Sequence, residues 1–360
     1  METLDEGGQL KGHCQVVGHS KSRPATVLWL SELHTEEKSQ WRNQTFVAEF
    51  ILSGFGAFQE LQIVLFLVFL VIYVVTMAGN ILIIALVVAD RQLHTPMYFF
   101  LGNLSCLEIC YTSSILPKFL INFMTGNRTI SVWGCTMQFY VFASLLGVEC
   151  CLLTAMSYDR YLAICKPLHY ATIMKERLCF SLAGVSWITG FLAMSVMFFL
   201  ISGLTFCGPN VIEHFFCDLT PIMRIACDET RKVELAATIF SSLFTLPPFV
   251  LTLTSYVLII STILKIPSTT GKKKAFSTCS SHLIVVTIFY ATLIIVYVMP
   301  KKKALGIINK VCSVFYTVLT PLVNPLVYSL RNQEVRNVLM KSVQKGITFI
   351  TTQRVQGNAF

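Results

Sequence analysis

The chain has 360 residues, of which 54% are hydrophobic and 13% charged, and its formal net charge at pH 7 is +9. Soluble domains carry about 25% charged residues, so composition argues against a soluble fold and favours a membrane protein. In a membrane protein basic residues set the orientation of the chain, so this positive charge does not indicate a nucleic-acid partner.

Residues 1–60 precede the first long apolar stretch and are predicted to form an extracellular N-terminal segment. Within them, residues 1–40 are polar, carry both signs of charge, and contain no apolar run longer than ATVLWL. Such a run is too short for a signal-peptide core with its flanks. We therefore expect 1–40 to be disordered, and the sequon NQT predicts a glycan on Asn43.

Seven mainly apolar stretches follow, and each reaches the roughly 20 residues that a helix needs to cross a bilayer. They cover residues 61–89, 97–123, 136–163, 178–203, 233–264, 276–299 and 307–330. The predicted fold is an all-α membrane protein: a seven-transmembrane helix bundle over 61–330, followed by a cytoplasmic tail over 331–360. An odd number of spans places the two termini on opposite sides of the membrane.

Lysine and arginine residues decide the orientation of this bundle. The loops after the first, third and fifth spans, together with the tail, carry basic residues with few acids to offset them. The opposite loops offset theirs with Glu213, Asp218, Asp228 and Glu229, although residues 301–303 are three lysines. The first set is therefore cytoplasmic, and the N-terminus and the cysteine-bearing loop 204–232 are extracellular.

Two glutamates lie where carboxylates are rare. Glu108 is midway along the second span and Glu149 midway along the third. An ionisable residue at that depth is a functional-site hypothesis by default, and two carboxylates in a low dielectric would not both ionise without a cation. The alternative is a protonated, hydrogen-bonded glutamic acid that serves packing alone.

The third span ends on the cytoplasmic side with Asp159, Arg160 and Tyr161. A buried arginine is tolerated only with a partner or access to water. Asp159 can neutralise Arg160 at rest, and release of the pair would free a cation for an intracellular partner. The alternative is an interfacial arginine whose side chain extends toward water.

The seventh span contains PLVNPLVYSLRN at residues 321–332. Pro325 interrupts the backbone hydrogen bonding of the helix, and Asn324 could satisfy the backbone groups that it frees. Tyr328 follows one turn later, near the level of Arg160. A kinked helix with a polar hinge can change between two arrangements.

Three helix faces are candidates for the wall of a ligand pocket. In the third span, spacing of i, i+3, i+4 and i+7 marks one face, and the sixth and seventh spans carry similar stripes. The candidate residues are Phe139, Phe142, Ala143, Leu146, Tyr290, Leu293, Ile294, Tyr297, Val314 and Thr317. If these faces converge, the cavity suits small hydrophobic or weakly polar ligands; the alternative is ordinary helix packing.

After Tyr328 the tail has an amphipathic pattern. Val335, Val338, Leu339 and Val343 define one apolar side, flanked by basic residues. We expect a short amphipathic helix that contacts lipid of the inner leaflet.

These features together resemble two nested protein families. The pair Gly79–Asn80, the DRY motif, Trp187 and the NPxxY motif look like rhodopsin-type (class A) G-protein-coupled receptors. Further motifs closely resemble the odorant (olfactory) receptor family over residues 43–345: LHTPMYFFLGNLSCLEICY, AMSYDRYLAICKPLHY, SY at 255–256, KAFSTCSSHL and PLVNPLVYSLRN. The sixth span reads IFYAT, without the Cys-Trp-x-Pro element of other class A receptors.

The resemblance implies a function and several site residues. A volatile hydrophobic ligand would bind in the outer half of the bundle of a multi-pass plasma-membrane receptor. The receptor would activate a stimulatory, olfactory-type heterotrimeric G protein and raise cyclic AMP. Arg160 would be the central contact, and Tyr256 and Tyr328 would stabilise the active form.

The resemblance also implies covalent and ionic features. Spacing alone allows three connectivities among four extracellular cysteines; the family pattern implies that Cys135 pairs with Cys217 and Cys207 with Cys227. It further implies a sodium or proton site at Glu108 and Glu149, with Asn80 and Asn324 nearby. No other cofactor is expected.

Other functions fit the sequence less well. A class A receptor for a lipid or peptide is the first alternative, and the sixth-span motif argues against it. A transporter or channel is the second, although the chain shows no internal repeat of the kind that transporters carry. No catalytic constellation is present, so an enzyme is not expected.

Overall fold

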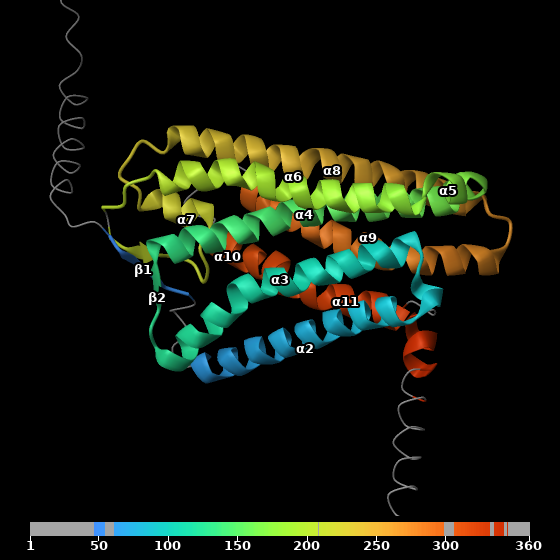
Figure 1. Cartoon of the computed structure of the whole chain (residues 1–360), viewed down its shortest axis with the longest axis horizontal. Helices are drawn as coiled ribbons and strands as arrows, with labels where there is room; N and C mark the ends of the chain where they lie inside the picture. Colours follow the sequence, from blue (N-terminus) through green and yellow to red (C-terminus); the bar gives the residue numbers. More distant parts are fainter. Residues whose placement is uncertain are drawn as a thin grey trace, which may run out of the picture. The chain divides into compact units, whose positions relative to one another are not determined.

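The computed structural model describes residues 47–54, 61–207, 209–298, 306–331, 335–341 and 344. All of them belong to one compact unit, Phe46–Phe360 (Figure 1). The predictions for residues 1–40 and for the glycan on Asn43 lie outside the described residues, and so does the lysine run at 301–303.

Five long helices correspond to the first five predicted spans. They are α2 (Gln62–Ala89), α3 (Pro96–Thr125), α4 (Val132–Cys165), α6 (Glu176–Ser202) and α8 (Arg231–Lys265). Short helices join them on the cytoplasmic side, η2 (Arg91–Leu93) and α5 (Pro167–Ile173), and α7 (Leu219–Arg224) lies in the extracellular loop before α8.

The last two spans are built from several helical pieces. The sixth is α9 (Thr269–Leu293) with a π-helical turn, η3 (Ile294–Val298); its apolar part is His282–Val298. The seventh is α10 (Gly306–Val314), the π-helical turn η5 (Phe315–Leu319) and α11 (Thr320–Arg331). Among the described residues, six helices are long and apolar enough to cross a membrane, the sixth of them being Asn309–Val327 of the seventh span, and with the shorter apolar helix His282–Val298 they confirm the predicted seven-helix bundle.

Helix α4 occupies the middle of the bundle. It contacts α3, α6 and α8, and 72% of its most apolar stretch is buried, whereas the corresponding fraction is 22% for α2 and 28% for α6 (Figure 1). The exposed apolar side chains of α2 and α6 therefore face the region of the lipid. Residues carried by α4 are surrounded by protein along most of the helix.

Small residues let two pairs of helices approach closely, as is common in membranes. A Cβ atom on Gly190 of α6 would lie 2.6 Å from Val148 Cγ2 and 2.7 Å from the carbonyl oxygen of Ser144 on α4. A Cβ atom on Gly79 of α2 would lie 3.1 Å from Pro325 Cβ on α11. These contacts set the spacing of the bundle.

A small β-sheet covers part of the extracellular end, and the sequence did not lead us to predict it. Strand β1 (Glu49–Leu52) lies between β2 (Thr129–Ser131) and β3 (Val211–Ile212). It pairs antiparallel with β2 and parallel with β3. The segment before the first span is therefore hydrogen-bonded to the short loop between α3 and α4 and to the long loop between α6 and α8.

The cytoplasmic tail begins with the expected amphipathic pattern. Residues 335–341 are helical, with Val335 and Val338 buried and Leu339 half-buried, while Arg336 and Lys341 are exposed. Val343 and Lys345 lie outside the described residues.

Candidate functional site

A cavity of about 70 Å³ lies beside the outer half of α4. Its wall comes from five helices and the turn η3. The lining residues are Phe139, Phe142, Ala143, Leu146, Gly147, Cys150, Met194, Met197, Leu219, Ala237, Phe240, Ser241, Phe244, Thr245, Leu293 and Tyr297. We call this space the central cavity; its wall is mainly apolar, with hydroxyl groups on Ser241, Thr245 and Tyr297.

Six of the ten predicted pocket residues line the central cavity: Phe139, Phe142, Ala143, Leu146, Leu293 and Tyr297. The other four lie outside its wall. The Tyr290 hydroxyl donates to the carbonyl oxygen of Cys150 at 3.0 Å, and the Thr317 hydroxyl donates to that of Ser313 at 2.6 Å. Ile294 is half-buried in η3, and Val314 packs against the main hydrophobic cluster.

Sequence reasoning missed the contribution of α8. Ala237, Phe240, Ser241, Phe244 and Thr245 form one side of the cavity. Their spacing of i, i+3, i+4, i+7 and i+8 is a single helix face. The same periodicity argument that found the stripe on the third span would have found this one.

Two disulfide bonds fix the extracellular loop beside the cavity. Cys135 at the start of α4 is bonded to Cys217, with 5.4 Å between the Cα atoms, and Cys207 is bonded to Cys227, with 5.8 Å. Both pairs are those implied by the family resemblance. The backbone N–H of Cys217 also donates to Gln138 Oε1 at 3.0 Å. A disulfide bond and a hydrogen bond therefore both connect Cys217 to α4.

A hydrogen-bonded chain connects this loop to the sixth and seventh spans. The Tyr297 hydroxyl donates to Asp218 Oδ1 at 3.2 Å and lies 2.9 Å from the Tyr316 hydroxyl, which donates to Ser313. Tyr297 lines the central cavity. A ligand that displaces the Tyr297 ring would therefore disturb contacts of both spans.

His214 packs in the same loop between two phenyl rings. Its ring centroid lies 4.7 Å from that of Phe215 and 4.6 Å from that of Phe216. Burial, with a smaller contribution from Lys310, lowers the pKa of His214 from 6.5 to about 3. The imidazole is therefore neutral at physiological pH, and the apolar packing of the loop does not bury a charge.

The cytoplasmic end of α4 holds the predicted charge pair. Arg160 Nη2 lies 3.1 Å from Asp159 Oδ2; the Asp159 side chain is fully buried and that of Arg160 is 18% exposed. The Tyr170 hydroxyl of α5 donates to the other carboxylate oxygen at 2.8 Å. Burial and the neighbouring Asp159 raise the pKa of Tyr170, so the hydroxyl keeps the proton that it donates.

Tyr256 and Tyr161 lie in a small apolar cluster of α4, α8 and α9 at this end. The Tyr256 hydroxyl is hydrogen-bonded to Nδ1 of His282 on α9. Sequence reasoning did not single out His282, although it lies in the quoted motif KAFSTCSSHL. Tyr328 belongs to α11, but its side chain lies outside the described residues.

The two mid-span glutamates are both completely buried. Asn324 Nδ2 donates to Glu108 Oε1 at 2.5 Å. In the part of the chain that the structure describes, the remaining carboxylate oxygens, Glu108 Oε2 and both oxygens of Glu149, have no hydrogen-bond partner, and neither has Oδ1 of Asn80 or Asn324. Several oxygen acceptors without donors are thus gathered between α2, α3, α4 and α11.

In the seventh span, the backbone carbonyl group freed by Pro325 accepts a hydrogen bond from a different residue than expected. Proline at 325 leaves the carbonyl oxygen of Pro321 without its helical donor. That oxygen accepts from Asn80 Nδ2 of α2 at 3.3 Å, while Asn324 donates to Glu108. The expectation that Asn324 serves the freed backbone is therefore wrong, because its amide nitrogen is taken by a carboxylate of α3.

Comparison with known proteins decides the family. A sequence profile described as olfactory receptor matches residues 69–345. Olfactory receptor 6B1 of Homo sapiens is 49% identical over 299 residues, 83% of this chain and 96% of that relative. Olfactory receptor 10A4 of Homo sapiens is 48% identical over 306 residues (85% and 97%), and olfactory receptor 8U3 of Mus musculus 45% over 304 (84% and 95%).

The chain belongs to the olfactory receptor family. It is accordingly an odorant receptor of the multi-pass plasma-membrane type, for which odorant ligands and G-protein coupling are expected and enzymatic activity is not. This sets aside the lipid- or peptide-receptor alternative and the transporter or channel.

In this olfactory receptor, the two candidate sites lie toward opposite ends of the helix bundle. The central cavity lies on the side of the disulfide-bonded loop, and the Asp159–Arg160 pair lies at the opposite end of α4. Within the described part of the chain, no three histidine, cysteine or acidic side chains are grouped so that they could hold a metal ion.

Proposed function

We propose that the receptor binds small, mainly apolar volatile molecules in the central cavity. The observation that supports this is the cavity wall: its described residues have aromatic, methionine and aliphatic side chains, with hydroxyl groups on Ser241, Thr245 and Tyr297, and none of them is charged. Such a wall favours ligands with one weakly polar group, because each buried polar atom of the ligand needs a hydrogen-bond partner.

The size of the cavity narrows the ligand class further. Its volume of about 70 Å³ is well below the roughly 300–1,000 Å³ of pockets for drug-sized ligands. Met194 and Met197 line one side, and methionine side chains adapt readily to a new neighbour. We therefore propose small odorants that enter by displacing these side chains.

Filling the cavity tests this proposal. Ser241→Phe on α8 adds a ring to the space, so the cyclic AMP response to every volatile that activates the wild type should be lost or shifted by at least about tenfold in concentration. The matched control is Leu243→Phe, since Leu243 is 58% exposed on the same helix. An unchanged response of a surface-expressed Ser241→Phe receptor would contradict the proposal.

We also propose how the bound ligand reaches the G protein. Arg160, Tyr161, Tyr256 and Tyr328 would form the inner contact and switch residues, with Asn324 and Pro325 as the hinge. The partner would be the stimulatory olfactory-type G protein, and the tail helix would rest on membrane lipid. The proposed glycan on Asn43 would be seen as a mass shift on enzymatic deglycosylation.

A sodium ion is the proposed occupant of the buried acidic site. Unpartnered oxygens of Glu108, Glu149, Asn80 and Asn324 are the ligand type that hard cations prefer. A cation there would connect α2, α3, α4 and α11 and favour the resting packing. The same oxygens could instead be satisfied by protons on the carboxyl groups.

Replacing either glutamate with glutamine distinguishes a bound sodium ion from protons on the carboxyl groups. Glu108→Gln and Glu149→Gln should each abolish the dependence of basal and odorant-evoked signalling on sodium concentration, because the amide removes one negative charge of the pair. Glu176→Gln, at the exposed start of α6, should retain it. Equal sodium sensitivity of the wild type and both buried variants would reject the ion.

A further inference from the structure

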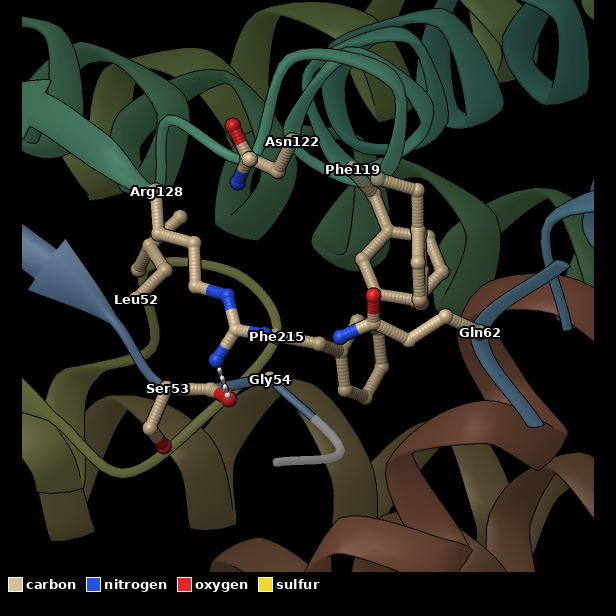
Figure 2. A pocket seen from close by; sticks show the side chains of 10 residues that line it. Leu52, Ser53, Gly54, Gln62, Phe119, Asn122, Arg128 and Phe215 are labelled. Atoms are coloured by element: carbon tan, nitrogen blue, oxygen red, sulfur yellow. Dashed lines mark hydrogen bonds between the residues drawn. The ribbon is translucent and has the colours of Figure 1, made fainter. Parts of the chain in front are cut away.

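A second cavity lies at the extracellular end of the bundle and shares no lining residue with the central cavity. It has a volume of about 50 Å³ and is enclosed by the end of β1, the start of α2, the end of α3, the loop to β2 and Phe215 (Figure 2). We call it the outer cavity. A cavity needs roughly 10–15 Å³ to hold one water molecule, so it has room for a group of a few non-hydrogen atoms.

Hydrogen-bond donors converge on the outer cavity. Toward the other described residues, the half-buried Arg128 makes one side-chain hydrogen bond, from Nη1 to the carbonyl oxygen of Ser53 at 3.5 Å, which is long for this type of bond. Figure 2 shows the nitrogen end of the Gln62 side chain turned toward the Arg128 guanidinium group. Two donor groups thus face the same space, and the described residues that line it include no carboxylate.

Asn122 adds a buried polar group to the same wall. Its side chain is 9% exposed, and its Oδ1 atom has no hydrogen-bond partner. Buried amide groups are normally satisfied on both atoms. The unpartnered Oδ1 is an acceptor, so it can take a hydrogen bond from a donor such as water but does not itself bind a carboxylate.

The rest of the wall is aromatic. Phe119 contacts Phe123 with ring centroids 4.8 Å apart and Phe215 with centroids 5.6 Å apart, and all three rings line the outer cavity. The wall therefore combines polar donors from Arg128 and Gln62 with an apolar aromatic surface. This combination fits an amphiphilic ligand better than a bare inorganic anion.

The backbone around Arg128 is held in place before any ligand arrives. Its carbonyl oxygen accepts from the Leu52 N–H at 2.9 Å, and Gly126, with a φ of 68°, ends α3 two residues earlier. Lys310 Nζ donates to the carbonyl oxygen of Gly54 at 3.0 Å and ties the same rim to α10. A backbone that is already fixed reduces the entropy that the site loses when a ligand binds.

We propose that the outer cavity is a second ligand site of the receptor and binds a small aliphatic monocarboxylate. The carboxylate would accept from the Arg128 guanidinium group and the Gln62 amide, and the short alkyl chain would lie against Phe119, Phe123 and Phe215. Arginine suits this role because its planar fork matches a carboxylate. The outer cavity is separate from the central cavity, so an experiment can refute one proposed ligand site and leave the other standing.

Direct binding of butanoate to the purified full-length receptor in lipid nanodiscs tests the proposal. Saturation-transfer NMR should detect butanoate on the wild type, and Arg128→Gln should weaken its affinity by at least about tenfold, as expected for loss of a charge-assisted hydrogen bond. The control is Arg224→Gln, because Arg224 is another extracellular arginine, 55% exposed and 3.8 Å from Glu213. Equal binding to wild type and Arg128→Gln, or none to the wild type, would overturn the site.

Ligand analogues test each half of the recognition. Butan-1-ol should not compete, because it lacks the charge, and chloride at the same concentration should compete far less, because it has no apolar part. Competition by butan-1-ol as strong as by butanoate would overturn the role of Arg128. Competition by chloride as strong as by butanoate would overturn the role of the aromatic wall.

A second variant covers the case in which Arg128→Gln does not fold. Gln62→Glu places a carboxylate opposite the guanidinium group, so it should occupy the anion position itself and abolish butanoate binding without removing Arg128. Ser241→Phe, which fills the central cavity, should leave butanoate binding intact. Retained binding in Gln62→Glu, or lost binding in a folded Ser241→Phe receptor, would each contradict a separate outer site.

Discussion

Replacing Arg160 with alanine is expected to abolish odorant-evoked cyclic AMP production. Arg160 lies at the cytoplasmic end of α4, 3.1 Å from the fully buried Asp159, and is the cation that we propose to contact the G protein. Its loss removes that contact and leaves Asp159 with Tyr170 as its remaining side-chain partner. A reporter assay on cells with matched surface expression measures the effect.

Removing one member of a buried ion pair also destabilises a protein, typically by about 3–5 kcal/mol, so two controls are needed. Arg160→Lys keeps the positive charge and should retain part of the signal, whereas Arg177→Ala, at an exposed position of the cytoplasmic end of α6, should signal like the wild type. Full activation by surface-expressed Arg160→Ala would refute the proposed role of the arginine.

Gly190→Ala should destabilise the bundle although it adds a single methyl group. The new Cβ atom would lie 2.7 Å from the carbonyl oxygen of Ser144 and 3.0 Å from the backbone nitrogen of Val148. Backbone atoms of α4 cannot move aside as a flexible side chain can, so α4 and α6 must separate. Overpacking of this kind costs about 1–3 kcal/mol, and it should appear as a lower thermal midpoint of the detergent-solubilised receptor and reduced surface expression.

Gly184→Ala provides the matched comparison for this prediction. Gly184 lies on the same helix, and a Cβ atom built there meets nothing within 4 Å. Alanine also has the higher intrinsic helix propensity, so this variant should be as stable as the wild type or slightly more so. If both variants had the same thermal midpoint, the close approach of α4 and α6 would not be a determinant of stability.

The fold could be predicted from the sequence because each span can be recognised from its own residues alone. A stretch such as 136–163 is apolar over its whole length, and no soluble arrangement could bury seven of them. The ends of the spans were predicted nearly as well: the third ends at residue 163 by prediction and at Cys165 in the structure. The pairing of Asp159 with Arg160 followed from the residues alone and the two disulfide pairs from the family resemblance, and all three pairs are present in the structure.

Features made by contacts between distant segments were harder to predict. The sheet formed by β1, β2 and β3 unites residues more than 70 positions apart, and its strands are too short to show a pattern. The wall of the central cavity includes a face of α8. The periodicity of the sequence could have shown that this face exists, but it could not have shown that the face points into the cavity. Four predicted pocket residues lie outside that wall although their helix faces were plausible, and two of them, Tyr290 and Thr317, make hydrogen bonds within the helix packing instead.

The sequence by itself determined that this chain crosses the membrane seven times, which end faces the cytoplasm, and which family it belongs to. These properties depend on local apolarity, on the distribution of charge and on contiguous motifs. The tertiary structure alone decided that Asn80 rather than Asn324 satisfies the carbonyl group freed by Pro325, and that Arg128 faces an aromatic cavity. The physical reason is that a hydrogen-bond partner is chosen by distance in the folded bundle, and residues 241 positions apart carry no local sign of being neighbours.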